Sequence, residues 1–209
     1  MKPAYFILII ALIAGCRQKS KYFTGVIDYK YSYTSDSLNV DSLAKARPDF
    51  GTMQYANVGY YSSFSRSGSL ASQDELRYYY YGPSNKCLSR GRNTSYCEDY
   101  GIANDSVLSV RVYDTDEKVL GYACRIVEMQ KKTSLVKYHI SRKLKANPLT
   151  YKNHKAYNWD IYGKAANGGV ILKVEHIFKL FTLHGIAVRL IITDDPMDRG
   201  LKEVTKDCL

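Results

Sequence analysis

A strict alternation of large apolar and polar side chains near the start of the chain sets the tightest limit on its fold. Over residues 22–34, one set of alternate positions carries the large apolar side chains of Phe23, Ile27, Tyr29, Tyr31 and Tyr33. Because successive side chains of a β-strand point to opposite faces, this pattern predicts a strand with one buried face. Thirteen residues are many for one strand, and such length favours a strongly curved sheet or a barrel.

Shorter alternating runs recur along the chain, separated by turn residues such as Gly82-Pro83. They predict strands at 52–57, 59–65, 75–81, 107–113, 120–129, 135–142, 170–178 and 182–192, with short ones around Cys87 and Cys97. We therefore predict a mainly β protein with minor α. Its architecture is a single curved antiparallel sheet or half-barrel of about nine to ten strands, covered by short helical segments.

Irregular or polar segments lie between and after the predicted strands. Residues 35–48 and 143–169 are too long for simple turns, so we expect each to contain a short helix and to cover the concave side of the sheet. Residues 114–118 are predicted to form a charged turn, and residues 197–209 a polar tail.

The first residues have the features of an export signal. Ala4–Ala14 is a run of eleven residues without a charge, which is shorter than the roughly 20 residues of a membrane span and fits a signal peptide. Gly15 and Cys16 follow, then a polar run. This order resembles the lipobox of bacterial lipoproteins, which implies cleavage between Gly15 and Cys16 and acylation of Cys16 with fatty acids such as palmitate. An ordinary secretory signal with an unmodified cysteine is the alternative.

This interpretation divides the chain into a signal peptide (1–15), a lipidated cysteine with its tether (16–21) and a single β domain (22–209). Arg17, and not Asp, follows Cys16. In lipoproteins of two-membrane bacteria that residue implies sorting to the outer membrane. Because no acidic cluster follows Cys16, we expect a protein anchored by lipid in the bacterial outer membrane and facing the periplasm.

The chain is basic, with a formal net charge of +10. Loss of Lys2 with the signal peptide would leave +9. Basic, aromatic-rich chains often bind nucleic acid, but an exported and anchored protein meets anionic lipids instead. We expect an anionic membrane surface as partner and no nucleic acid; the alternative is that the lysines are simply a solvated surface. The oligomeric state stays open.

Four cysteines remain once Cys16 is assigned to lipid: Cys87, Cys97, Cys124 and Cys208. An even number in an oxidising compartment predicts disulfide bonds, with three possible pairings. Of these we favour Cys87–Cys97, which closes a short hairpin, and Cys124–Cys208, which ties the tail to a central strand.

Motifs of known enzymes are missing from the sequence. It contains no G-x-S-x-G, no H-E-x-x-H and no phosphate-binding loop. The four histidines, His139, His154, His176 and His184, are scattered, which is typical of half-exposed strand positions. We therefore predict no catalytic residues, no metal site and no cofactor.

An ordered series of short motifs resembles exported lipoproteins of the Bacteroidetes. The motifs are Phe23-Thr24-Gly25-Val26-Ile27-Asp28-Tyr29, Leu120-Gly121-Tyr122-Ala123-Cys124, Lys137-Tyr138-His139-Ile140, Leu144-Lys145-Ala146-Asn147-Pro148 with Trp159 and Tyr162, and Gly169-Val170-Ile171-Leu172-Lys173. Such proteins are similar to the LolA/LolB lipoprotein carriers, half-barrels in which a sheet with an apolar concave face wraps around helices. The chain departs from that pattern in its C-terminal tail and in having no clear long helical plug.

This resemblance implies a non-catalytic binding module for a hydrophobic ligand, either an acyl chain or a lipoprotein. The candidate lining residues are Ile27, Tyr29, Tyr79, Val110, Tyr122, Ile126, Tyr138, Val174 and Val188. The alternative is a structural or interaction lipoprotein of the cell envelope with a closed core and no small ligand. The two differ in whether the concave face is open, because core-facing and ligand-facing side chains alternate in the same way.

The lipobox interpretation predicts the effect of Cys16→Ser. The variant should not incorporate radioactive palmitate, because the sulfur that is acylated is gone. It should also leave the membrane fraction, because acyl chains hold such proteins in the bilayer. A Ser20→Ala variant is the matched control and should label normally. Retention of Cys16→Ser in salt-washed membranes would contradict lipid anchoring at this residue.

Overall fold

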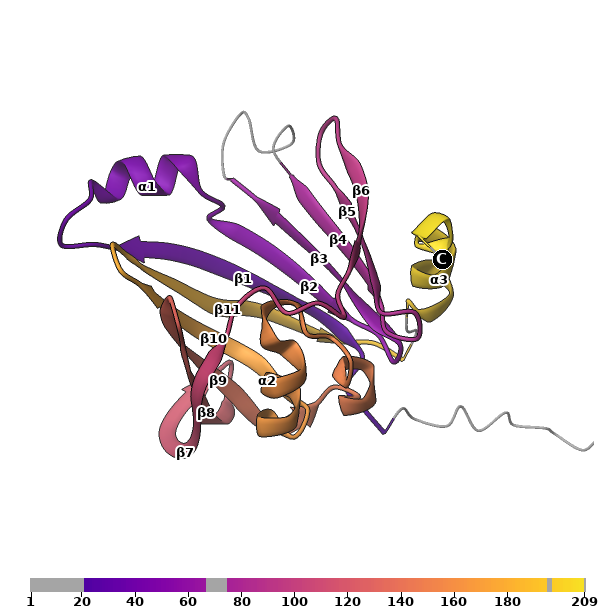
Figure 1. Ribbon diagram of the computed structural model, residues 1–209. Helices are drawn as coiled ribbons and strands as arrows, with labels where there is room; N and C mark the ends of the chain where they lie inside the picture. The colour runs from indigo at the N-terminus through magenta and orange to yellow at the C-terminus, as the bar shows by residue number, and fades with distance from the viewer. Residues whose placement is uncertain (1–20, 67–74, 195–196, 209) are drawn as a thin grey trace, which may run out of the picture.

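The computed structural model describes residues 21–66, 75–194 and 197–208. These residues form one open antiparallel sheet with strand order β6-β5-β4-β3-β2-β1-β11-β10-β9-β8-β7 (Figure 1). The strands are β1 (Gly25–Thr34), β2 (Phe50–Tyr55), β3 (Gly59–Ser65), β4 (Leu76–Tyr81), β5 (Lys86–Arg90), β6 (Ser95–Asp99), β7 (Val107–Val119), β8 (Tyr122–Lys131), β9 (Ser134–Lys145), β10 (Gly169–Phe178) and β11 (Thr182–Ile192). The predicted mainly β class with a curved antiparallel sheet is confirmed, with 11 strands instead of nine to ten.

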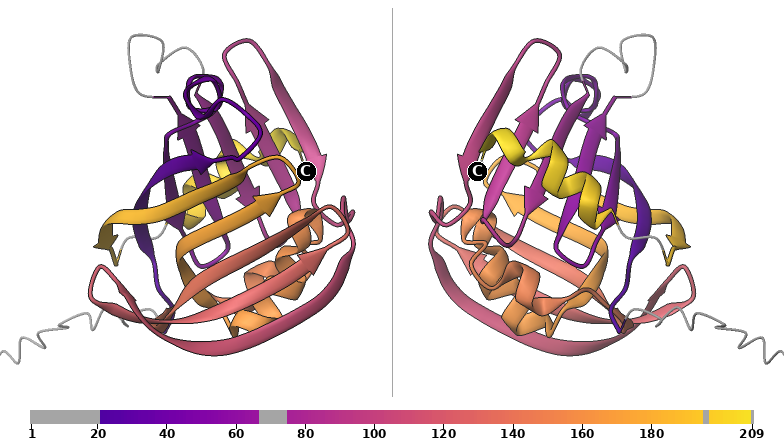
Figure 2. Two further views of the ribbon diagram at one scale, coloured as in Figure 1. Left: turned by 90° about the vertical axis from the view of Figure 1, so that its left-hand side faces the viewer. Right: turned by 90° about the vertical axis from the view of Figure 1, so that its right-hand side faces the viewer.

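Strand β1 joins the two halves of the sheet. It pairs with β2 on one side and with β11 on the other, and its register with β11 runs from Gly25↔Ile192 to Thr34↔Thr182. A register shift between Asp28 and Tyr29 interrupts this pairing, and such bulges bend and twist a strand. The two halves curve toward each other and leave a concave face between them (Figure 2).

The segment that follows β9 covers part of the concave face, as predicted. It contains the 3₁₀ turns η1 (Pro148–Tyr151) and η2 (Ala156–Asn158) and helix α2 (Trp159–Ala166). Tyr162 and Ala166 of α2 pack in one core cluster with Val127 of β8 and Val136 of β9. In Figure 1 the helix lies against the half of the sheet formed by β7 to β10.

Helix α1 (Val40–Ala46) forms within the other predicted segment but does not cover the concave face. Asn39 caps it by accepting a hydrogen bond from the backbone N–H of Ser42 at 2.9 Å, as Asn does at helix N-termini. The helix buries no residue and lies beyond the end of β1 (Figure 1). The expectation for 35–48 is therefore wrong in its placement, since the helix lies beyond the end of the strand and packs none of its side chains into the core.

The C-terminal residues form structure where a polar tail was predicted. Helix α3 (Asp198–Val204) and the turn η3 (Lys206–Cys208) follow β11. Leu201 is fully buried, and a Cβ added at Gly59 of β3 would lie 3.2 Å from its Cδ1 atom. Because Gly59 precedes the inward-facing Tyr60, α3 covers the convex face of the sheet. No helix among the described residues is long and apolar enough to cross a membrane.

Strand β7 differs from its prediction. It continues through the expected charged turn to Val119, and the turn comes at Leu120 and Gly121, whose φ angles are 50° and 80°. Leu108 is 67% exposed. A register shift between Val107 and Ser109 leaves Leu108 outside the pairing with β8, and β7, as the last strand of the sheet, has no further strand beside it.

Both predicted disulfide pairings are wrong. The bond joins Cys97 of β6 to Cys208 of η3, while Cys87 and Cys124 are buried free thiols. The register of β5 and β6 places Cys97 opposite Leu88, so the side chain of Cys87 points to the other face of the sheet. Cys124 lies in β8, near the sheet edge opposite to β6.

The disulfide bond predicts a stability effect for Cys208→Ser. The bond spans 111 residues, and opening it should lower the free energy of unfolding by about 2–5 kcal/mol. Urea denaturation with and without reductant measures this. The wild type should fall to the value of the variant when reduced, and the variant should not respond. An equal response of both proteins would mean that other cysteines carry the bond.

Candidate functional site

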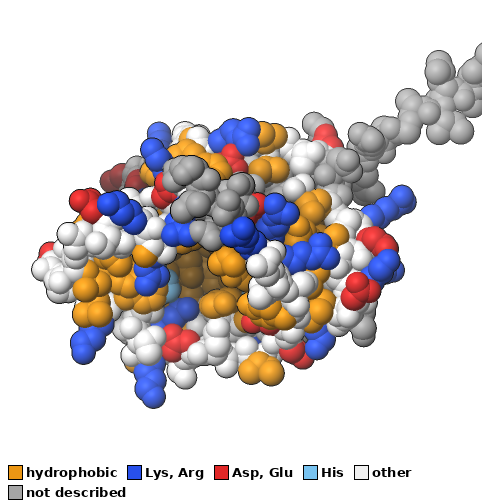
Figure 3. Space-filling view, turned by 90° about the horizontal axis from the view of Figure 1, so that it is seen from above, with side chains coloured by type: hydrophobic (Ala, Val, Ile, Leu, Met, Phe, Trp, Pro, Cys, Tyr) orange, Lys and Arg blue, Asp and Glu red, His pale blue; other side chains and the backbone are white. Residues whose placement is uncertain are grey.

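A cavity of about 400 Å³ lies on the concave side of the sheet. Most of its wall consists of the aromatic rings of Tyr29, Tyr31, Tyr60, Phe64, Tyr78, Tyr100, Tyr138, Tyr157 and Trp159. Figure 3, which looks onto the molecule from above, shows hydrophobic side chains around a hollow. Strands from both halves of the sheet and the segment after β9 contribute, so the cavity exists only when both halves are joined.

Glycines give one of these rings its position. Tyr31 lies beside Gly185 of β11 in the strand register, and Gly51 of β2 lies on its other side. A Cβ added at Gly185 would lie 2.6 Å from Tyr31 Cε1, and one at Gly51 would lie 2.8 Å from Cε2. The two missing side chains therefore let the Tyr31 ring lie flat, stacked on Tyr29 with 6.3 Å between ring centroids.

Three of the nine predicted lining residues contact the cavity: Tyr29, Tyr138 and Val174. Ile27 lies on the same side of β1 but is fully buried in the closed core, and the half-buried Tyr122 packs against that core. These two residues therefore pack in or against the closed core and do not reach the cavity.

The other four candidates lie elsewhere. Ile126 pairs with His139 in the register of β8 and β9, so it faces the convex side, one residue out of phase with the inward Val127. Tyr79 faces the same side, where its ring lies 5.1 Å from that of Tyr61. The last two, Val110 and Val188, are exposed.

Several residues that line the cavity were not predicted. In β3, Tyr60, Ser62 and Phe64 all line the cavity, and their alternation in the predicted strand 59–65 is a signal that would have found them. His176, expected at a half-exposed strand position, also lines the cavity, together with Lys131 at the end of β8. No local pattern marks Tyr100 or Tyr157, because they come from irregular segments, and no pattern identifies Trp159, the first residue of α2, as a lining residue.

Two basic side chains lie in the otherwise aromatic wall. Lys131 is 5% exposed, and its Nζ atom donates a hydrogen bond to the carbonyl of Tyr157 at 3.3 Å. Burial lowers the pKa of this amine, although the negative charge of Asp105 opposes the shift. His176 shares a hydrogen bond of 2.9 Å with the hydroxyl of Ser134. Burial, aided by the charge of Lys131, lowers the pKa of His176 to about 4, so this imidazole is neutral at pH 7.

A buried histidine supports the wall of the cavity from behind. His154 is fully buried, and its Nε2 atom lies 2.9 Å from the hydroxyl of Tyr60. Its ring packs against Tyr80 and Tyr100, with centroids 4.4 Å and 4.7 Å away. Burial lowers the pKa of His154 to about 3. The neutral ring therefore acts as a packing and hydrogen-bonding element of the aromatic cluster.

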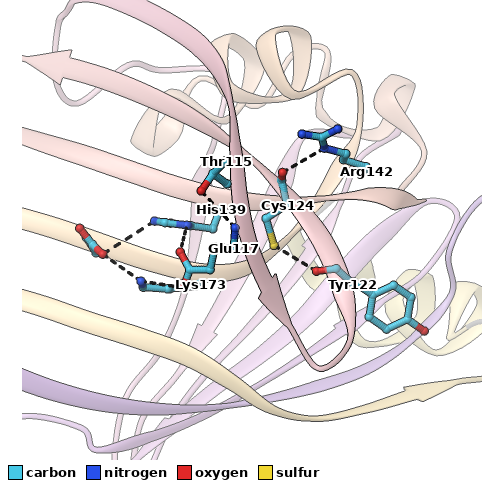
Figure 4. A network of polar contacts seen from close by, with 8 residues as sticks. Thr115, Glu117, Tyr122, Cys124, His139, Arg142 and Lys173 are labelled. Carbon is cyan, nitrogen blue, oxygen red and sulfur yellow. Dashed lines mark hydrogen bonds and ion pairs between the residues drawn. The ribbon is translucent and has the colours of Figure 1, made fainter.

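A cluster of charged side chains lies on the convex face (Figure 4). His139 Nδ1 is 2.7 Å from Glu117, and Lys173 Nζ is 2.9 Å from Glu117 and 3.1 Å from Glu175. His139 and Lys173 adjoin the cavity-lining Tyr138 and Val174, so strand alternation places them on the opposite face. Lys173 bridges the two carboxylates of Glu117 and Glu175, and burial lowers the pKa of His139 between them, an arrangement that links β7, β9 and β10 and suits a structural network.

The free thiol beside this cluster is unsuited to act as a nucleophile. Cys124 Sγ donates to the carbonyl of Tyr122 at 3.5 Å. Burial raises the pKa of the thiol, whereas a reactive cysteine needs a lowered one. Within residues 21–66, 75–194 and 197–208, no group of three or more His, Cys, Asp and Glu side chains gathers in a way that suits a metal ion.

Comparison with known proteins identifies no family. No protein-family model matches the chain, and no curated protein matches it in sequence. Among solved structures, that of PNGF-II in the C2 space group has a TM-score of 0.43 and 10% sequence identity. The similarity covers 85% of this chain and 29% of that one.

The low pKa of His154 predicts how stability depends on pH. In the unfolded chain a histidine takes up its proton near pH 6.5, whereas folded His154 stays neutral down to about 3. The unfolded state therefore binds more protons between these values, and stability falls as pH falls, by about 1.4 kcal/mol per pH unit. In His154→Gln, urea denaturation between pH 4.5 and 6 should show a slope smaller by that amount.

The matched control for this slope is Tyr60→Phe. It removes the hydroxyl group that His154 contacts but keeps the histidine. We expect it to lower stability at every pH by about 1–3 kcal/mol and to keep the wild-type slope. Equal slopes in the wild type and His154→Gln would contradict the account.

Proposed function

We propose that this protein is an outer-membrane-anchored lipoprotein that binds a hydrophobic ligand, an acyl chain or an acylated protein, without covalent chemistry. The observation that carries the proposal is the aromatic cavity of about 400 Å³ on the concave face of the sheet. Protein interiors are packed as densely as organic crystals, with few voids larger than a water molecule. A cavity of this size falls in the range of known ligand pockets, about 300–1,000 Å³.

The wall suits an apolar ligand. The hydroxyl of Tyr29 donates to the carbonyl of Ile171 at 2.8 Å, and the hydroxyl of Tyr60 lies against His154. Because these polar groups are bonded to the protein, the rings offer carbon surface to the cavity. Each Å² of apolar ligand surface removed from water contributes about 25 cal/mol to binding.

The start of the sequence supports the location in this proposal. The lipobox resemblance at Gly15 and Cys16, with Arg17 after it, suits a protein held at the periplasmic face of the outer membrane. Five residues, 17–21, separate that anchor from the β domain, a reach of about 17 Å at most. The basic net charge and the resemblance to LolA/LolB half-barrels agree with acyl chains as ligands and an anionic membrane surface as a further partner.

A second candidate is a structural or interaction lipoprotein of the cell envelope. Exposed apolar side chains on the edge strand β7, among them Leu108 and Val112, favour it, since such surfaces often bind other proteins. In that case the protein would bind no lipid and would cross-link to an envelope protein through β7.

A pair of valine substitutions tests the binding proposal. Val174→Trp should fill part of the cavity, and Val188→Trp adds the same ring at an exposed position outside it. Titration of the Cys16→Ser protein with a fluorescent fatty acid should give saturable binding. The first substitution should weaken it by about tenfold or more, and the second by less than about twofold. Equal affinities in all three proteins would place the binding outside the cavity.

A further inference from the structure

We infer that the cavity takes an amphiphile whose oxyanion headgroup, a carboxylate or a phosphate, binds to Lys131. The inference rests on the proposed binding function and specifies the chemistry of its ligand. Lys131 ends strand β8 and lines the cavity beside Tyr157 and His176. A lysine at this place puts a positive charge in a wall that is otherwise mostly aromatic.

The ammonium group of Lys131 has few partners within the protein. Its Nζ atom carries three N–H donors, and its hydrogen bond to the Tyr157 carbonyl is a long one, 3.3 Å. That is the only hydrogen bond of this side chain within the described residues, and it forms no ion pair with any of them. Buried charges are usually paired, because an unpaired charge loses its hydration without compensation. A ligand oxyanion would supply the missing partner.

One acid, Asp105, acts on Lys131 without forming an ion pair with it. Its carboxylate accepts hydrogen bonds from the backbone N–H of Ser106 at 2.7 Å and from the hydroxyl of Thr133 at 3.2 Å. It therefore lies within electrostatic reach of Lys131 without pairing with it. The amine keeps donors for a group inside the cavity.

The backbone beside Lys131 adopts an unusual conformation. Tyr157 and Asn158 have φ angles of 56° and 63°, in the left-handed region that side chains other than glycine rarely adopt. The side-chain oxygen of Asn104 accepts a hydrogen bond from the backbone N–H of Tyr157 at 2.9 Å. The side-chain amide of Asn158 donates one to the carbonyl of Asp105 at 3.0 Å. Residues held in this way cluster at ligand-binding sites, and here the strained pair includes the carbonyl that contacts Lys131.

The rest of the cavity suits an apolar tail. Tyr31, Phe64 and Val174 line it from β1, β3 and β10. His176 is committed to the hydroxyl of Ser134, so Lys131 is the basic group left for a headgroup. One positive charge in an apolar cavity selects an anionic amphiphile over a neutral or cationic one, because only the anion replaces the lost hydration.

Three ligands with the same tail test the inference: dodecanoic acid, dodecyl phosphate and dodecanol. The full chain carrying Cys16→Ser is titrated by calorimetry, alone and with Lys131→Met, Lys131→Arg or Lys132→Met. Lys132 is the exposed neighbour and serves as matched control. Lys131→Met should weaken binding of at least one anion by about tenfold or more and that of dodecanol by less than about twofold. Lys131→Arg should keep anion binding, and Lys132→Met should match the parent protein.

The outcomes separate this inference from the proposed function. Binding of no ligand to the parent protein would overturn both. Binding that Lys131→Met leaves unchanged, or weakens equally for anions and alcohol, would overturn the role of Lys131 and leave the binding module standing. The tighter of the two anions identifies the headgroup. Methionine replaces a buried charge with an apolar chain and should fold; if it does not, Lys131→Gln provides the same comparison.

Discussion

The pairing of β1 with β11 is the contact on which the rest of the structure depends. It joins strands from the two ends of the chain and makes one sheet from two series of hairpins. Asp28 of β1 strengthens the contact, because its buried carboxylate pairs with Arg189 of β11 and accepts a hydrogen bond from Thr52 of β2. Without this pairing neither half has a partner across the concave face.

The cavity follows from the curvature of that sheet. Tyr60 and Phe64 come from one half and Tyr138 and Val174 from the other, so the two halves face each other across an open space. A closed core would fill this space with side chains. Here α2 fills only part of it, and His154 holds the aromatic rings behind the wall. The same open space that weakens packing is what allows a ligand to bind.

Much of the fold was predictable from local pattern, and much less of the site was. Alternation identified β1, β10 and β11, and it placed Tyr29, Tyr138 and Val174 on the inner face. Alternation failed where it does not distinguish the inner face of a strand from the outer face, or a covered strand from one at the sheet edge. In β8 a shift by one residue exchanged Ile126 for Val127, because both faces of that strand are apolar. For Val110 the alternation was correct, since it pairs with the inward-facing Met129 of β8, but the closed core does not cover this part of the edge strand and Val110 stays exposed.

The sequence by itself determined the β class and an N-terminal segment that resembles a lipobox, because each depends on residues close together in the chain. Tertiary structure decided the pairing of Cys97 with Cys208 and the place of Lys131. Cys97 meets Cys208 because α3 folds back over the convex face, across 111 residues. Lys131 is the last residue of β8, and it becomes a buried charge only when Tyr157 and the opposite half of the sheet close around it.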